Sequence, residues 1–300
     1  MGKLVIIDGN AIMHRAFHAM PPLTTRSGEP INAVYGLVSM FLRIVQDLKP
    51  NSIVVTFDEK EKTFRHKEFE EYQSQRPPTH EDLSSQFEKA RDFFAAVNVP
   101  VYSKPGFEAD DVIATICESS PKEESKVVVT GDRDLLQLVD DKKNTMLYMP
   151  VLGLSNAKLF NEKEALARMG VPPHLIPDYK ALVGDPSDNY PGVTGIGPKT
   201  AEKLLKDYES VDNIYAHLKD IEPKIRQKLE RGSSEAKLFH RLATVVRDVP
   251  IKIDFLQMEK WQVDSKEVLK LFEDFGFKTL SDRIKKVGKS VEAEKQTSLF

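Results

Sequence analysis

The sequence predicts an α/β fold in which helices flank a mainly parallel central sheet, followed by a helical C-terminal part. Three runs rich in β-branched residues support the sheet: KLVIID at 3–8, SIVVTFD at 52–58 and KVVVTGD at 126–132. Continuous apolar runs of this kind, separated by helical stretches, are typical of strands that a parallel sheet buries on both faces. From about residue 158 the pattern becomes helical with Pro and Gly turns.

The other elements follow from hydrophobic periodicity and turn signals. A weaker strand run, TMLYM, lies at 145–149, and helices are expected at roughly 32–48, 80–97 and 109–119. The polar end, KVGKSVEAEKQTSLF, predicts a flexible tail. We therefore divide the chain into an α/β core, a helical part and a tail, at residues 1–165, 166–287 and 288–300.

Composition restricts the class of protein. The 300 residues are 40% hydrophobic and 30% charged, which is ordinary for a soluble chain of one or two domains. We expect no membrane span, because the sequence has no window of about 18 uncharged apolar residues. The start, MGKLVIIDGN, reaches an aspartate too early for a secretory signal. The single cysteine, Cys117, excludes an internal disulfide and indicates a reducing cytoplasm.

Each of the three strong strand runs ends in an aspartate: Asp8, Asp58 and Asp132. Ligands of open parallel sheets bind beyond the carboxyl ends of the strands, so three strands would deliver three carboxylates to one edge. Aspartate is also a common turn residue after a strand, and that interpretation suits any one of them better than all three together.

Further acids come in tight groups at expected helix starts and turns, in the segments GFEADD, TGDRD and GDPSDN: they are Glu108, Asp110, Asp111, Asp134, Asp185 and Asp188. One or two acids in a first turn would offset the helix dipole, at about 0.3–1 kcal/mol each. So many carboxylates in one pocket would raise one another's pKa unless cations were present. Carboxylates without Cys or His favour Mg²⁺ or Mn²⁺ over zinc. Two such ions, about 3.5–4 Å apart, form the clamp used in phosphodiester hydrolysis.

A glycine-rich segment, PGVTGIGPKTAEKLL at 191–205, is the second chemical motif. Pro198 separates Gly197 from Lys199, so a nucleotide-binding P-loop is not expected. Gly195 and Gly197 would let the backbone approach a phosphate at the N-terminus of the next helix. The side chains that would lie beside that phosphate are Lys199, Thr200 and, one turn further on, Lys203. An ordinary helix–helix turn is the alternative, but it explains one glycine better than the whole motif.

These motifs together closely resemble the 5′ nuclease domain of bacterial DNA polymerase I, a member of the flap endonuclease family. The resemblance runs from LVIIDGNAIMHRAFHAMPPLTTRSGEP through FDEKEKTFRHKEFEEYQSQRPP, GFEADDVIATI and TGDRDLLQLV to GDPSDNYPGVTGIGPKTAEKLL, within residues 3–285. It implies a PIN-like 5′ nuclease core with a helical arch at about 60–95, and a DNA-binding helical part with a helix-hairpin-helix variant, often with bound K⁺. It also implies a two-metal, structure-selective 5′→3′ exonuclease and flap endonuclease that acts on flaps, nicks and RNA primers in replication and repair.

The resemblance also assigns roles residue by residue. It places the metal ligands on all nine acids named above, and the catalytic residues that we expect are Asp8, Asp58, Asp110, Asp132, Arg15 and Arg76. It places Arg15 near the scissile phosphate and Tyr35 near the terminal bases, where a surface arginine and a core tyrosine are the alternatives. The DNA contacts that we expect are Arg15, Tyr35, Arg65, Arg76, Lys180, Gly195, Gly197, Lys199, Thr200 and Lys203. A solvated helix lysine is the alternative for Lys180.

One position departs from the family. Where relatives have Tyr-Lys in the arch, the segment EEYQSQRPP has Gln73, while Arg76 is retained. Glutamine cannot supply positive charge to a transferring phosphate, an effect often worth several kcal/mol. Either Lys67, Arg65 or Arg76 compensates, or turnover is reduced.

The last five residues, QTSLF at 296–300, resemble the peptide by which bacterial replication proteins bind the sliding clamp. Short motifs also arise by chance, so an uninteresting tail is the alternative. We expect a monomer in the bacterial cytoplasm, associated with the nucleoid.

Two other functions stay open from the sequence. One is a ribonuclease on a related acid-lined α/β core of the PIN type, which would have no use for a duplex grip. The other is a non-enzymatic DNA-binding module whose acids only assist folding, which the complete ligand set argues against.

Overall fold

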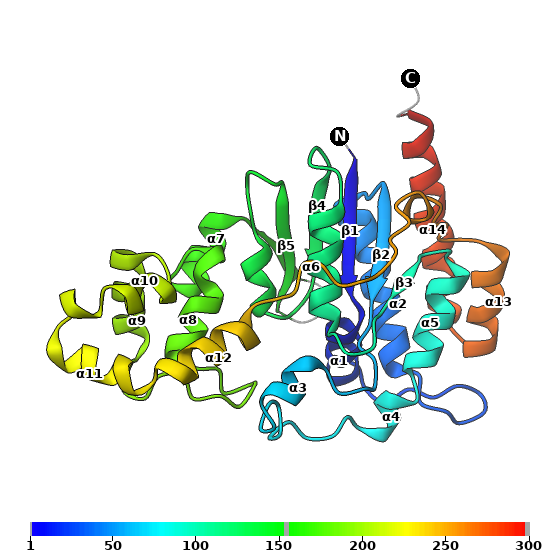
Figure 1. Ribbon diagram of the computed structural model, residues 1–300. Helices are drawn as coiled ribbons and strands as arrows, with labels where there is room; N and C mark the ends of the chain where they lie inside the picture. Colours follow the sequence, from blue (N-terminus) through cyan, green and yellow to red (C-terminus); the bar gives the residue numbers. More distant parts are fainter. Residues whose placement is uncertain (1, 153–155, 298–300) are drawn as a thin grey trace.

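A single mixed sheet lies at the centre of the computed structural model, which describes residues 2–152 and 156–297 of the chain. Within these residues six strands pair in the order β3-β2-β1-β4-β5-β6 (Figure 1). The strands are β1 (Lys3–Asp8), β2 (Ser52–Thr56), β3 (Val101–Tyr102), β4 (Ser125–Val129), β5 (Thr145–Leu152) and β6 (Asn156–Phe160). Every pairing is parallel except that of β5 with β6. The predicted mainly parallel α/β sheet is therefore confirmed.

Helices connect the strands and cover the sheet. The helices of the N-terminal half are α1 (Gly9–Ala19), α2 (Asn32–Leu48), α3 (Phe64–Glu68), α4 (Glu81–Ser84), α5 (Phe87–Ala96), α6 (Ala109–Ser119) and the 3₁₀ turn η1 (Asp134–Leu138). The C-terminal half contains α7 (Glu162–Met169), η2 (Pro173–Leu175), α8 (Ile176–Val183), α9 (Pro198–Tyr208), α10 (Val211–Ala216), η3 (Leu218–Asp220), α11 (Pro223–Arg231), α12 (Ser233–Ala243), η4 (Gln257–Glu259), α13 (Lys266–Phe275) and α14 (Lys278–Thr297).

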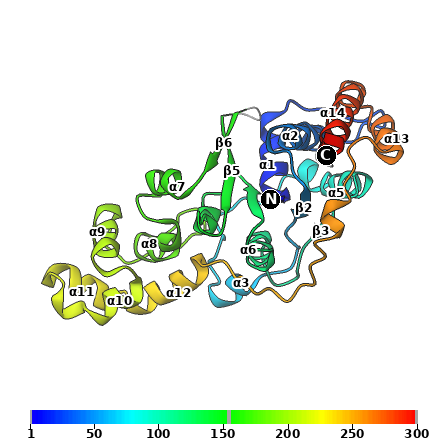
Figure 2. The same ribbon diagram turned by 90° about the horizontal axis from the view of Figure 1, so that it is seen from above.

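The central strands are buried on both faces, as their continuous apolar runs predict. In β1, Leu4 and Ile6 belong to one buried cluster with α6, whereas Val5 and Ile7 belong to another with α2. Figure 2 shows α6 and α2 on opposite sides of the sheet. This alternation follows from the two-residue period of a strand. The parallel pairing of β1 with β2 and β4 places the carboxyl ends of these strands at one edge of the sheet.

The expected arch region at about 60–95 differs from the structure in its second half. The helix expected at 80–97 is interrupted between α4 and α5 by Gln86, whose buried side chain accepts a hydrogen bond from the amide of Ala33 at the start of α2 (2.8 Å). Phe93 and Phe94 of α5 are fully buried in the cluster around α2. Because α5 packs into the core, the arch segment ends before α5 begins.

The bounds of the helical part also differ from the expected range 166–287. Helices α7 to α12 extend beside the β5–β6 end of the sheet (Figure 1). The chain then returns to the core, where Trp261, Val268 and Phe272 pack in the same cluster as α2 and α5. The chain between α12 and α14 therefore belongs in part to the α/β layer, because its apolar side chains complete that layer's core.

The tail expected from residue 288 continues instead as helix, since α14 extends to Thr297. Val287 is buried and Val291 packs against the α2 cluster, so apolar contacts extend the helix past the expected boundary. Residues 298–300 of the QTSLF motif lie outside the described residues. In the part of the chain that the structure describes, no helix is long and apolar enough to cross a bilayer.

Candidate active site

The carboxyl ends of β1, β2 and β4 bring three of the predicted acids to one edge of the sheet. Asp8 is the last residue of β1 and caps α1, because its Oδ1 accepts a hydrogen bond from the amide of Ala11 (2.9 Å). Its Oδ2 accepts a hydrogen bond from the Thr130 hydroxyl, just after β4 (2.7 Å). Asp58 and Asp132 follow β2 and β4 by a few residues. The strand-end prediction is thus confirmed in its geometry.

The N-terminus of α6 adds two more carboxylates to this edge. Glu108 precedes the helix and Asp110 lies in its first turn, while the amide of Ala109 donates a hydrogen bond to Asp58 Oδ1 (2.7 Å). We call this set the inner acid group: Asp8, Asp58, Glu108, Asp110 and Asp132.

Burial and mutual repulsion disfavour the ionised forms of carboxylates in the inner acid group. Burial raises the pKa of Asp8 to about 7, and it raises the pKa of Glu108 to about 7 although the Arg65 guanidinium acts in the opposite direction. Burial together with the charges of Asp132 and Asp8 raises the pKa of Asp110 well above its ordinary value. Carboxylates crowded in this way favour either protons or cations.

Asp111, the third acid of GFEADD, does not join this group. Its side chain is fully buried, and its two oxygens accept hydrogen bonds from Nη1 and Nη2 of Arg65, both at 2.8 Å. Asp111 also accepts hydrogen bonds from the amides of Glu108 (3.1 Å) and Val246 (2.8 Å). The expectation that Asp111 is a metal ligand is wrong in this geometry, because all its acceptor positions are used inside the fold.

Arg65 is likewise not available to DNA. Only 2% of the residue is exposed, and its remaining donors bond the carbonyl oxygens of Leu242 (2.8 Å) and Thr244 (3.1 Å). The sequence could not separate this buried arginine from a phosphate-binding one, since both occur in a charged segment before an acidic motif.

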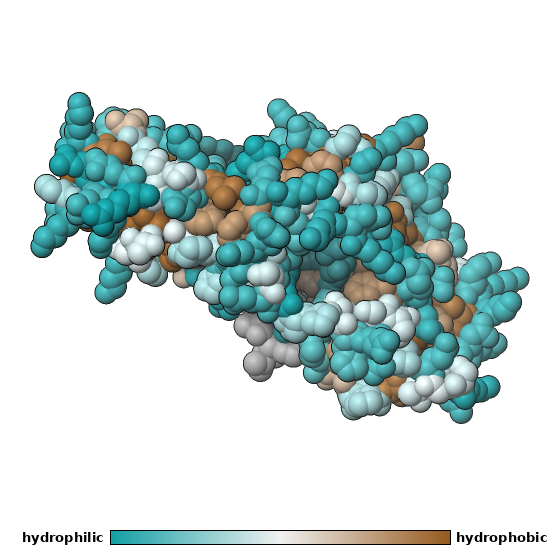
Figure 3. Space-filling model, turned by 60° about the horizontal axis from the view of Figure 1, so that its bottom comes forward, coloured by the Kyte–Doolittle hydropathy of each residue, from teal (hydrophilic) through white to brown (hydrophobic). Residues whose placement is uncertain are grey.

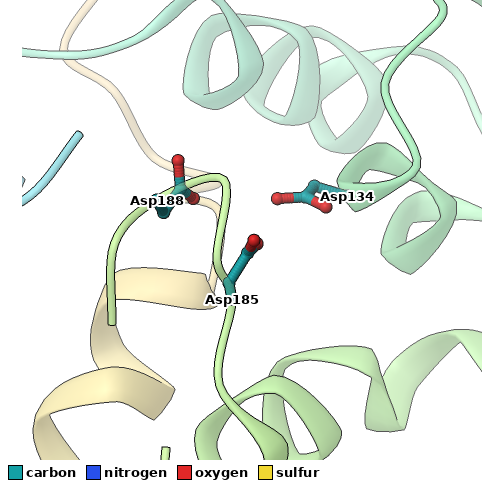
Figure 4. A group of neighbouring side chains, drawn as sticks. All are labelled: Asp134, Asp185 and Asp188. Carbon is teal, nitrogen blue, oxygen red and sulfur yellow. The ribbon is translucent and has the colours of Figure 1, made fainter. Parts of the chain in front are cut away.

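A second set of carboxylates lies on the side of the helical part. Oxygens of Asp134, Asp185 and Asp188 lie within 4.8 Å of one another, and Figure 4 shows the three side chains pointing toward a common centre. We call these residues the outer acid group. Asp134 begins η1, and the other two lie in the GDPSDN loop after α8. Asp134 N donates to Asp132 Oδ1 (2.8 Å), which joins the outer group to the inner one.

Lys180 of α8 is buried between members of the outer acid group. Its ammonium donates hydrogen bonds to Asp185 Oδ2 and forms an ion pair with Asp134 Oδ1. Although burial raises it, the pKa of Asp185 is held below its ordinary value by this ammonium. The alternative of a solvated helix lysine is therefore excluded, and Lys180 faces the acids.

The arch segment is in contact with the outer acid group through Asp188. The side-chain amide of Gln73 and the guanidinium of Arg76 both donate to Asp188 Oδ1, at 3.0 and 2.9 Å. Asn189 donates from its side chain to the carbonyl of Glu71 and to the Ser74 hydroxyl, both at 2.9 Å. Gln73 thus lies next to a predicted metal ligand, at the position where the sequence resemblance led us to expect a lysine.

Both acid groups open into one pocket of about 630 Å³. Its lining includes Asp8, Asp58, Glu108, Asp110, Asp132, Asp134 and Asp188, together with Gln73 and Arg76. Figure 3 shows the face at this edge of the sheet, which is largely hydrophilic and hollowed near its middle. The carboxylates of this lining are hard oxygen donors, so they fit divalent cations of the magnesium type.

Arg15 and Tyr35 are among the predicted residues that lie outside the lining of this pocket. Arg15 is half-buried on α1, whereas its neighbour His14 lines the pocket. Tyr35 is half-buried on α2 with its ring edge-on to Phe277, at 5.1 Å between centroids. His14 and Asn10, which were not among the expected site residues, line the pocket four residues apart on α1, a helical spacing that is visible in the sequence.

The glycine-rich segment forms the turn between α8 and α9. Gly195 has φ +83°, a left-handed conformation that favours glycine, and Gly197 precedes the first residue of α9. Lys199 and Lys203 are exposed on α9, while Thr200 is half-buried. Lys228 of α11 donates to the Gly195 carbonyl (2.8 Å) and braces the turn. The expected exposed turn with a basic helix start is present.

This combination of fold and pocket is that of a metal-dependent nuclease, and comparison with known proteins identifies the family. Residues 3–170 match the 5'-3' exonuclease N-terminal resolvase-like domain, and residues 171–266 match the 5'-3' exonuclease C-terminal SAM fold. A 5'-3' exonuclease of Aquifex aeolicus is 35% identical over the full length of both chains. The chain belongs to the 5′-3′ exonuclease family and is a nuclease, a hydrolase.

Longer relatives and solved structures agree with this assignment. DNA polymerase I of Bacillus subtilis is 37% identical over 99% of this chain, which spans about a third (34%) of that polymerase. A complex of the bacteriophage T5 D15 flap endonuclease with DNA and metal ions has a similar fold, with a TM-score of 0.64, 19% identity and coverage of 97% and 99% of the two chains. At that identity the likeness concerns the fold.

Proposed function

We propose that this nuclease is a structure-selective 5′→3′ exonuclease and flap endonuclease that acts on DNA or RNA/DNA in primer removal and repair. The observation that carries the proposal is the convergence of the inner and outer acid groups in one pocket, closed on one side by the arch segment that contains Gln73 and Arg76. The T5 flap endonuclease of similar fold, seen with DNA and metal ions, supports this substrate class.

The pocket would hold two Mg²⁺ (or Mn²⁺) ions, one bound by the inner acid group and one by the outer acid group. Such ions supply activation of the attacking water and stabilisation of charge on the phosphate and the leaving oxygen. Asp111 is omitted from this ligand set, because Arg65 and backbone amides occupy its oxygens.

Residues of the chain itself would position the substrate. Arg76 is half-exposed, with 51% of its side chain accessible at the rim of the pocket, so it can reach a phosphate once it leaves Asp188. We assign Arg15 and Tyr35 to the substrate on the α1–α2 side, outside the pocket lining.

The turn between α8 and α9 would hold the duplex without reading its sequence. Lys199 and Lys203 offer exposed positive charges, and the helix start offers amide donors for a backbone phosphate. We interpret this element as a helix-hairpin-helix variant that grips one strand, with a K⁺ ion at the turn.

The remaining assignments concern the cellular setting. We propose a monomer that acts at the bacterial nucleoid in the cytoplasm during replication and repair. The Gln296–Phe300 segment would recruit it to the sliding clamp.

A substrate panel tests the proposal. Duplexes with a labelled 5′ flap, a nick or a blunt end are compared with a single strand of the same sequence, in Mg²⁺ and in EDTA. The proposal expects metal-dependent products of short length from the 5′ end, with the flap cleaved fastest. Equal cleavage of all four substrates, or release of label from the 3′ end, would contradict it.

A further inference from the structure

Lys180 occupies the space between two carboxylates that are proposed to bind an ion. It lies in the last turn of α8, is 8% exposed, and contacts Asp134 from η1 and Asp185 from the loop after α8. One ammonium therefore joins two segments that the sequence separates by about fifty residues. A buried charge of this kind persists only when partners of opposite sign surround it.

The two acid groups differ in how their charge is neutralised. In the inner acid group, Glu108 forms an ion pair with Arg65 (3.4 Å), whose guanidinium is also bound to Asp111. In the outer acid group, Lys180 contacts Asp134 and Asp185, and Arg76 contacts Asp188. The outer group thus has a buried ammonium in contact with two of its three aspartates.

We propose that Lys180 is a built-in counter-ion that competes with the divalent ion of the outer acid group. An ammonium and a divalent ion that both contacted Asp134 and Asp185 would repel each other at that range. Binding of the second ion therefore favours withdrawal of Lys180, which its flexible four-carbon stem permits. It follows that the outer group binds its ion more weakly than the inner group does.

This inference rests on the proposed pair of ions, and Mn²⁺ titration by calorimetry separates the two claims. The wild type should bind one Mn²⁺ tightly and a second at least about tenfold more weakly. Lys180→Met keeps the length of the side chain but removes its charge, so the second site should tighten about tenfold or more. Lys180→Arg keeps the charge and should leave the second site weak.

Thermal unfolding gives a second readout that needs no catalysis. Without divalent ions, Lys180→Met should melt below the wild type, because Asp134 and Asp185 lose their counter-ion. Mn²⁺ should raise its melting temperature by more than it raises that of the wild type. Lys126→Met is the matched control: Lys126 is also buried, at 2% exposure, but it lies on β4 near Pro121 and away from the acids, so its Mn²⁺ shift should equal that of the wild type.

If Lys180→Met does not fold, the inference can be tested on the wild type by chemical acetylation of its lysines. Mass spectrometry then measures how far Lys180 is modified. Lys180 should be protected without metal and become reactive as the second Mn²⁺ binds. Protection at every Mn²⁺ concentration, or an unchanged or weaker second site in Lys180→Met, would overturn the inference and leave the two-ion function standing. A wild type that binds no Mn²⁺, or only one ion, would contradict the proposed function itself.

Discussion

The guanidinium of Arg65 and the carboxylate of Asp111 form a buried pair, with both nitrogen–oxygen contacts at 2.8 Å. The same guanidinium bonds the carbonyls of Leu242 and Thr244, and the same carboxylate accepts the amide of Val246. The pair therefore ties the base of the arch and the start of α6 to the last turn of α12 and the segment that follows it. It is part of the framework of the site, whereas Asp110, the preceding residue, faces the ions' proposed position.

Replacement of Asp111 by Asn tests this framework role. It should lower the free energy of unfolding by about 3–5 kcal/mol, because one partner of a buried pair is removed and Arg65 stays charged. Urea unfolding measures the loss. Asp110→Asn is the control and should be far less harmful to stability without metal, since it removes one of several mutually repelling carboxylates. If Asp111→Asn kept full stability and instead lost one bound Mn²⁺, Asp111 would be a ligand.

Gln73→Lys tests the departure from the family. A lysine there would place positive charge beside Asp188 and near the transferring phosphate, so single-turnover cleavage of a 5′ flap should become faster. Rapid quench of a labelled flap measures the rate. Gln73→Met removes the hydrogen bond to Asp188 (3.0 Å) without adding charge, and it separates the two effects. An unchanged rate for Gln73→Lys would show that Arg76 or another cation already supplies the charge.

Without metal, the free energy of unfolding should depend on pH because the pKa of Asp8, in the inner acid group, is raised. The pKa of Asp8 is raised by burial to about 7 in the folded protein, from an ordinary value of 3.8. The protonated form of Asp8 contributes to the free energy of unfolding below pH 4, and this contribution is lost as the pH rises from about 4 to about 7. Asp8→Asn keeps a capping oxygen but does not titrate, so its stability relative to the wild type should increase across that range in EDTA.

Mg²⁺ should offset this loss in the wild type and raise its melting temperature, most clearly at pH 7. Calorimetric melts at several pH values, with EDTA or Mg²⁺, measure both effects. A melting temperature that Mg²⁺ does not change would contradict the proposal that the inner acid group binds divalent ions. A difference in stability between Asp8→Asn and the wild type that stays constant with pH would also contradict it.

Lys199→Ala with Lys203→Ala tests the duplex grip. Both side chains are exposed on α9, so the fold should be unaffected. If each contacts one phosphate, the slope of log K against log salt should become less steep by about 1.8, since each contact contributes about 0.9. Fluorescence anisotropy with a nicked duplex in EDTA measures the slope. Lys122→Ala with Lys142→Ala, exposed elsewhere, should leave the slope unchanged.

The strands and their terminal aspartates could be predicted because their signals are local. A continuous apolar run followed by aspartate is visible in KLVIID, and parallel pairing then brings Asp8, Asp58 and Asp132 to one edge. The partners of other charged residues depend on the packing of distant segments. Nothing near Arg65 or Lys180 indicates that one pairs with Asp111 and the other with Asp134. Gln86 interrupts the helix expected at 80–97 for the same reason, since its partner Ala33 is far away in the sequence.

The central claim is that this pocket hydrolyses phosphodiester bonds with divalent ions held by its carboxylates. Cleavage of a labelled 5′ flap in Mg²⁺ by the wild type and by Asp132→Ala tests it most directly. We predict short 5′ products from the wild type and a loss of at least about 10³-fold in Asp132→Ala, which removes several kcal/mol of charge stabilisation. Binding of the flap in EDTA should be retained. Equal cleavage by Asp132→Ala, or none by the wild type, would contradict the account.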